Sequence, residues 1–108
     1  MKKIVVTGAQ GLLGEACCRI LKANYEVIPL TRAEVDLSDS EHLLDYFSGL
    51  DFDFLINTAA MSGLEQCLDH PETAKLVNTV APRLMAKVCN EKGAKMLHVS
   101  TDYVFDGQ

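Results

Sequence analysis

The sequence has no tryptophan, no Cys-x-x-Cys pair and no run of about 18 consecutive apolar residues. Without such a run, no segment of the 108 residues is expected to cross a bilayer. Lys and Arg do not cluster anywhere and the formal net charge is −5, so we expect no nucleic-acid surface. The four cysteines lack metal-ligand spacing, which predicts reduced, mostly buried thiols in a cytoplasmic protein and no metal site.

The first fourteen residues combine a strand pattern, a glycine-rich turn and the start of a helix. The run at 4–6 is β-branched, and Gly8, Gly11 and Gly14 follow it before an apolar helix pattern begins at Leu12. A helix N-terminus behind a glycine turn offers unpaired N–H groups to a pyrophosphate. The alternative is a tight turn without a ligand, and the flanking strand and helix favour the phosphate site.

Apolar periodicity predicts strands that alternate with helices along the whole chain. The expected strands cover residues 4–6, 26–30, 33–36, 54–58 and 96–100, the third of them very short. The expected helices run from Leu12 to about Asn24, from an N-cap at Ser38 to Gly49, and over 71–92, with 64–70 ambiguous. Because the connections are long enough to cross over, we predict a Rossmann-like, doubly wound α/β fold, a parallel sheet of about five strands ordered 3-2-1-4-5.

Ligands of doubly wound sheets bind beyond the carboxyl ends of the strands, where the winding reverses. Segments that directly follow expected strands therefore converge on one site: Gly8–Gly14, Thr31-Arg32, Thr58–Ser62 and Ser100–Tyr103. The hydroxyls of the last segment would bind a substrate carbonyl or cap the loop. His98, inside the last expected strand, is predicted to pack rather than to act as a base.

Arg32 stands where many dinucleotide sites carry an acid that favours NAD. A cation there suits the 2′-phosphate of NADP, and the alternative is an exposed surface arginine. Asp36 has two compatible roles, as an acceptor for the adenine amino group and as the opener of the next helical turn. Ala59 and Ala60 either let a cofactor ribose lie on the backbone or serve ordinary close packing.

Together these motifs resemble those of the extended short-chain dehydrogenase/reductases, whose cofactor turn reads here Thr7-Gly-x-x-Gly-x-x-Gly14. Within that superfamily the chain is most similar to the dTDP-4-dehydrorhamnose reductases. The matching stretches span essentially the whole chain: Leu30-Thr-Arg-Ala-Glu-Val-Asp-Leu37, Ile56-Asn-Thr-Ala-Ala60, Val77-Asn78 with Ala81-Pro-Arg-Leu84, and His98-Val-Ser-Thr-Asp-Tyr-Val-Phe-Asp-Gly107.

The resemblance implies reduction of a 4-keto-6-deoxy sugar nucleotide, of the dTDP-4-dehydrorhamnose to dTDP-L-rhamnose type, with NADPH or NADH; Arg32 favours NADPH. It also implies a role for each matched residue. Gly8, Gln10, Gly11, Leu12 and Leu13 would contact the pyrophosphate, and Arg32 would contact the 2′-phosphate. Asp36 and Leu37 would flank the adenine, and Ala59 and Ala60 would border the ribose. Thr101 would be the catalytic hydroxyl that polarises the sugar ketone, and Tyr103 would line the sugar-nucleotide pocket.

Two departures from the reductase pattern bear on function. After Ala60 the chain reads Met-Ser-Gly-Leu-Glu-Gln-Cys67, where the reductases usually have Tyr or His, then Thr, Val-Asp and Lys-Ala-Glu. That loop borders the substrate, so the residues do not fix which sugar nucleotide is bound. The superfamily's acid is the tyrosine of a Tyr-x-x-x-Lys pair, and none of Tyr25, Tyr46 and Tyr103 stands in such a pair.

We therefore expect residues 1–108 to be the N-terminal NAD(P)-binding domain of a longer reductase, without its substrate domain and without turnover of its own. The open edge of the last strand leaves room for pairing with another chain, including a homodimer. Two other hypotheses remain. One is a non-catalytic regulatory subunit of the methionine adenosyltransferase type, which has a similar Asp-Tyr-Val-Phe-Asp-Gly stretch, and the other is a stand-alone nucleotide-binding module. A Tyr-x-x-x-Lys pair beyond Gln108 would favour the reductase.

Overall fold

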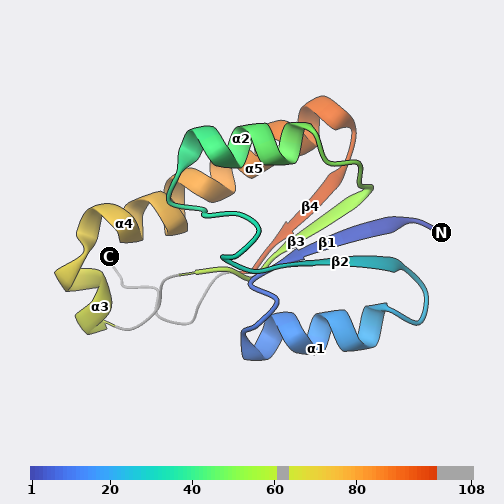
Figure 1. Ribbon diagram of the computed structural model, residues 1–108, viewed down its shortest axis with the longest axis horizontal. Helices are drawn as coiled ribbons and strands as arrows, with labels where there is room; N and C mark the ends of the chain where they lie inside the picture. The colour runs from blue at the N-terminus through green and yellow to red at the C-terminus, as the bar shows by residue number, and fades with distance from the viewer. Residues whose placement is uncertain (61–63, 100–108) are drawn as a thin grey trace.

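The computed structural model, which describes residues 1–60 and 64–99, contains a parallel sheet with helices on both faces (Figure 1). Its strands lie in the spatial order β2-β1-β3-β4, and they are β1 (Lys3–Thr7), β2 (Glu26–Leu30), β3 (Phe54–Asn57) and β4 (Lys95–His98). The central strand β1 pairs with both β2 and β3, so its end faces the ends of two neighbours. The predicted Rossmann-like, doubly wound parallel α/β fold is confirmed.

The short strand expected at 33–36 does not form, so the described residues build a sheet of four strands. The N–H groups of Glu34 and Val35 both donate to the carbonyl oxygen of Thr31, at 3.1 and 3.2 Å. These bonds close a turn, and a turn cannot supply the extended backbone that strand pairing requires. The other strands keep the relative order that the sequence predicts.

Figure 1 shows α1 (Leu12–Leu21) on one face of the sheet and α2 (Ser40–Ser48) with α5 (Ala81–Lys92) on the other. Between β3 and α5 the chain forms α3 (Leu64–Asp69), α4 (Pro71–Lys75) and a π-helical turn, η1 (Leu76–Val80). Throughout the part of the chain that the structure describes, every helix is too short or too polar to cross a membrane.

The single helix expected over 71–92 is interrupted by η1. Pro82 has no N–H and therefore cannot bond the carbonyl of Asn78, four residues earlier. Just before the proline, the N–H of Ala81 reaches the carbonyl of Leu76, five residues back, which is the π-helical pattern. The wide turn thus sits directly ahead of the position at which the proline removes an α-helical bond.

Helix ends follow the sequence with two exceptions. Gly93 ends α5 in the left-handed conformation, with a φ of 76°, directly after the last residue of the helix expected over 71–92. The N-cap of α2 is Asp39 rather than the expected Ser38, because the Ser38 hydroxyl donates to the Asp36 carboxylate at 2.6 Å instead. Asn24 does not end α1 in the left-handed conformation, since no described residue other than glycine has a positive φ.

The core lies between the sheet and the pair α2 and α5. Phe47 of α2, Met85 of α5 and Leu55 of β3 are each at most 1% exposed. On the opposite face, the apolar pattern that begins at Leu12 is only partly covered on α1. Leu12 is 93% exposed and Ile20 67% exposed. The described residues supply no second helix to pack beside α1 on that face (Figure 1).

A chain of hydrogen bonds joins β1, β3 and β4 at their carboxyl ends. The Thr7 hydroxyl donates to Asn57 Oδ1 at 2.5 Å, and both side chains are almost fully buried. Because Oδ1 is the acceptor, the Asn57 Nδ2 group faces Nδ1 of His98, 3.0 Å away. His98 is exposed, so the prediction that it packs inside its strand is wrong. The bond to Asn57 fixes its ring instead.

The start of α1 lies against the end of β3 at the glycine turn. Gly8 has a φ of 65°, and the Thr58 hydroxyl donates to the carbonyl of Thr7 at 2.7 Å. A Cβ on Gly14 would overlap the carbonyl oxygen of Gly8 and lie 2.9 Å from Thr58 Oγ1. The helix can approach the turn this closely only because position 14 carries no side chain.

Thr7→Val tests the buried bond between the central strands. The change keeps the shape of the side chain but leaves Asn57 Oδ1 buried without its donor, so we expect the free energy of unfolding to fall by about 1–3 kcal/mol. Thr7→Ser, which keeps the hydroxyl and loses a methyl group, should cost less, about 1 kcal/mol. Urea denaturation measures both. Equal or greater stability of the valine protein would contradict the role given to this bond.

Gly14→Ala tests the close contact of α1 with the glycine turn. The added methyl group forces the turn or the helix to move, and we expect a loss of about 1–3 kcal/mol in thermal or urea unfolding. Gly49→Ala is the matched control. A Cβ there would meet its nearest atom at 3.7 Å, so the control should leave stability unchanged or slightly raised. Equal stability of the two variants would refute the contact.

Candidate functional site

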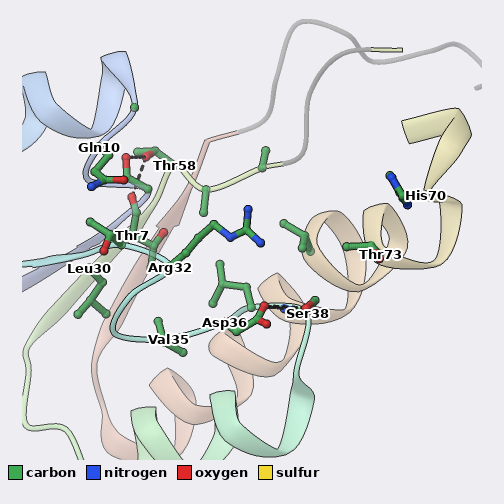
Figure 2. A pocket seen from close by; sticks show the side chains of 17 residues that line it. Thr7, Gln10, Leu30, Arg32, Val35, Asp36, Ser38, Thr58, His70 and Thr73 are labelled. Atoms are coloured by element: carbon green, nitrogen blue, oxygen red, sulfur yellow. Dashed lines mark hydrogen bonds between the residues drawn. The ribbon is translucent and has the colours of Figure 1, made fainter. Parts of the chain in front are cut away.

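A cavity of about 550 Å³ opens beyond the carboxyl ends of β1, β2 and β3 (Figure 2). Sites for small molecules and cofactors usually have volumes of about 300–1,000 Å³. The lining comes from the turns that follow these strands and from the helical segment opposite them: Thr7, Gly8, Gln10, Gly11, Leu30, Thr31, Arg32, Val35, Asp36, Leu37, Ser38, Thr58, Ala59, Ala60, His70, Thr73 and Val77.

The glycine turn presents the N-terminus of α1 to this cavity. Gly8 and Gln10 line it, and Gly11 is the N-cap residue, which has no side chain to accept from the first helical turn. The first N–H groups of the helix have no acceptor within it. An anion placed here would meet these donors together with the partial positive charge of the helix end.

Leu12 and Leu13 were also expected at this position. Their side chains lie outside the cavity lining and are 93% and 47% exposed. What these residues can offer a ligand is therefore the backbone N–H of the first helical turn and not an apolar contact.

Arg32 supplies a cation to the cavity. Figure 2 shows its side chain extended into the space between the glycine turn and α4. Within residues 1–60 and 64–99 it forms no ion pair, although Asp36 and Glu34 are close to it in sequence. A guanidinium without a protein carboxylate partner is available to an anionic group of a ligand.

Asp36 lies below Arg32 in Figure 2 and is held by Ser38. Its Oδ1 accepts from the Ser38 hydroxyl at 2.6 Å and from the Ser38 N–H at 2.9 Å. These two bonds, followed by the nearby charges of Arg32 and His42, lower the pKa of Asp36 below its usual value. The residue is therefore an ionised acceptor that opens the turn before α2, and beside it Leu37 adds an apolar wall.

The remaining walls come from the end of β3 and from the helical segment after it. Ala59 and Ala60 leave room along the backbone after β3, as expected. Across the cavity lie His70 and Thr73 of the α4 region and Val77 of η1, three residues that no motif in the sequence predicts at the site. Pro71 marked a helix start there, but no sequence signal showed that this helix faces the turns after β1 and β2.

The structure thus brings together the expected residues Gly8, Gln10, Gly11, Arg32, Asp36, Leu37, Ala59 and Ala60 around one cavity. Thr101 and Tyr103, the expected catalytic and substrate-binding residues, lie outside the described residues. Among the residues that are described, no three metal-ligating side chains form a cluster. The described part of the site offers backbone N–H donors, the Arg32 cation and apolar walls, groups that suit a phosphorylated ligand.

Comparison with known proteins identifies the family of this chain and its relatives. The family model described as RmlD substrate binding domain matches residues 1–108. The spore coat polysaccharide biosynthesis protein SpsK of Bacillus subtilis is 38% identical, with all of this chain aligned to 38% of SpsK. The dTDP-4-dehydrorhamnose reductase of Burkholderia thailandensis is 37% identical over 97% of this chain and 35% of its own.

Among solved structures, a dTDP-4-dehydrorhamnose reductase of Bacillus anthracis in complex with NADP superposes with a TM-score of 0.85. It is 26% identical, and the match covers 98% of this chain and 38% of that one. The chain thus spans little more than a third of the length of the proteins it matches. With a family model that covers every residue, the chain belongs to the RmlD substrate binding domain family, as its resemblance to the dTDP-4-dehydrorhamnose reductases predicts.

Proposed function

We propose that residues 1–108 are the NADP(H)-binding part of a reductase that acts on a 4-keto-6-deoxy sugar nucleotide. The observation that carries the proposal is the cavity at the carboxyl ends of β1, β2 and β3. It brings a helix N-terminus together with Arg32, which forms no ion pair within the described residues. The names of the relatives support the substrate class, and the NADP in the Bacillus anthracis reductase supports the cofactor.

In this proposal the pyrophosphate lies against the glycine turn. Gly8, Gln10 and Gly11 border it, and Leu12 and Leu13 donate their backbone N–H groups. The positive φ of Gly8 and the missing Cβ at position 14 let the turn and the helix end come together, which supports a cradle for a phosphate. This arrangement does not distinguish NADPH from NADH, because the two share the pyrophosphate.

The adenosine half lies toward the second strand and α4. Arg32 binds the 2′-phosphate that only NADP(H) carries, and Asp36 accepts from the adenine amino group while Leu37 packs on the ring. Ala59 and Ala60 border the ribose. The ionised state of Asp36 supports its role as an acceptor, and its bonds to Ser38 hold the carboxylate in place.

In this proposal the residues that contact the substrate are Thr101 and Tyr103. NADPH, when bound, supplies the hydride that reduces the ketone. Thr101 donates a hydrogen bond to the ketone oxygen, and Tyr103 lines the sugar-nucleotide pocket. The proton for the new alkoxide comes from a Tyr-x-x-x-Lys pair that these 108 residues do not contain. Because the proton donor is absent from these 108 residues, we expect them to bind the cofactor without turning over substrate on their own.

Arg32→Ala tests the cofactor assignment. Loss of a charge-assisted bond to the 2′-phosphate should weaken NADPH binding about 10- to 100-fold and leave NADH binding within about threefold. Fluorescence titration of the full-length protein measures both dissociation constants. The control is Arg19→Ala, which removes an exposed arginine that pairs with Glu15 on α1, away from the cavity, and should change neither. If Arg32→Ala weakens the binding of NADPH and NADH equally, Arg32 does not bind the 2′-phosphate.

Turnover by the full-length protein tests the reaction. We expect it to oxidise NADPH when given dTDP-4-keto-6-deoxy sugar, and Thr101→Val to lower kcat by about 100-fold or more, because the ketone loses a donor. Residues 1–108 alone should oxidise none. Absorbance at the NADPH band follows the reaction. Binding of NADPH without oxidation by the full-length protein would favour a regulatory subunit instead.

A further inference from the structure

Three hydrogen bonds join Glu34 to Thr31 in the turn that carries Arg32. Its Oε1 accepts from the N–H of Thr31 at 2.6 Å and from the Thr31 hydroxyl at 2.8 Å. The Thr31 oxygen in turn accepts from the N–H of Ala33 at 3.2 Å, and the Glu34 N–H returns to the Thr31 carbonyl at 3.1 Å. The carboxylate and the backbone of Glu34 therefore both bond to Thr31 and close the turn around Arg32 and Ala33.

Both ends of this turn are anchored. Before it, Leu30 ends β2 and is 2% exposed, and after it Val35 is 3% exposed and donates its own N–H to Thr31. With these ends fixed, the bonds between Glu34 and Thr31 leave the backbone at Arg32 little freedom. A long arginine side chain on a mobile turn would lose much conformational entropy on binding, and a fixed turn reduces that loss.

The same bonds occupy the carboxylate that stands nearest to Arg32 in the sequence. Glu34 bonds to Thr31 and forms no ion pair with any residue in the described ranges, so the guanidinium is left to the cavity. The backbone and hydroxyl donors of Thr31 hold the pKa of Glu34 below its usual value, because both bonds stabilise the charged carboxylate.

We propose that Glu34 is a positioning residue for cofactor choice: by binding Thr31 it fixes the turn from which Arg32 reaches the 2′-phosphate of NADPH. This inference rests on the proposed function. A different role for Glu34 makes the opposite prediction. As a bare negative charge beside the 2′-phosphate, it would repel NADPH, and its removal would raise NADPH affinity.

The experiment is a double-mutant cycle on the full-length protein, with the dissociation constants of NADPH and NADH as readouts. Glu34→Ala should weaken NADPH binding about three- to tenfold and leave NADH unchanged, because only NADPH uses Arg32. Glu34→Gln should retain most of the wild-type preference, since its amide oxygen can still accept from Thr31. In an Arg32→Ala background, Glu34→Ala should have no further effect on the preference.

Glu41→Ala, an exposed acid in the first turn of α2, is the matched control for loss of one negative charge and should leave the preference unchanged. Unchanged NADH affinity shows that each variant is folded. Stronger NADPH binding by Glu34→Ala, no change, or an equal effect with and without Arg32 would each overturn the inference. If Arg32→Ala leaves the preference for NADPH over NADH intact, the assignment of Arg32 to the 2′-phosphate fails. If Arg32→Ala lowers that preference and Glu34→Ala leaves it intact, the Arg32 assignment stands and the positioning role of Glu34 fails.

Discussion

The hydrogen bond from Thr7 to Asn57 joins the two central strands at the edge where the site forms. Both groups are almost fully buried, so each would lose its partner at a high cost in free energy if the strand ends separated. The turn after β1 and the segment after β3 begin at these two residues, and Thr58 adds a second link to the Thr7 carbonyl. The cavity thus has two walls whose spacing is set by buried polar bonds.

The sequence predicted the parts of the molecule that depend on local pattern. Short apolar runs predicted the strands, and their alternation with helices predicted the strand order. Gly8, Gly11 and Gly14 predicted the turn. It failed where a local hydrogen bond competed with a pattern. The run at 33–36 alternates apolar and acidic residues, as a strand can, yet bonds to Thr31 close it into a turn. Ser38 likewise bonds to Asp36 instead of capping α2.

The far wall of the cavity could not be predicted for a different reason. His70, Thr73 and Val77 line the cavity opposite the turns that follow the strands, and nothing in the periodicity of 71–92 specifies that arrangement. The apolar side chains of α1 stay exposed for the same kind of reason. Within the described residues, no second helix lies beside α1 to cover them. Tertiary contacts, and not propensity, decide both features.

The most direct measurement is a crystal structure of the full-length protein with NADP bound. We expect the 2′-phosphate within hydrogen-bonding distance of the Arg32 guanidinium, with the Glu34 carboxylate still bonded to Thr31 and the pyrophosphate on the glycine turn. An adenosine that turns its 2′-phosphate to solvent, or a Glu34 side chain paired with Arg32, would contradict that expectation.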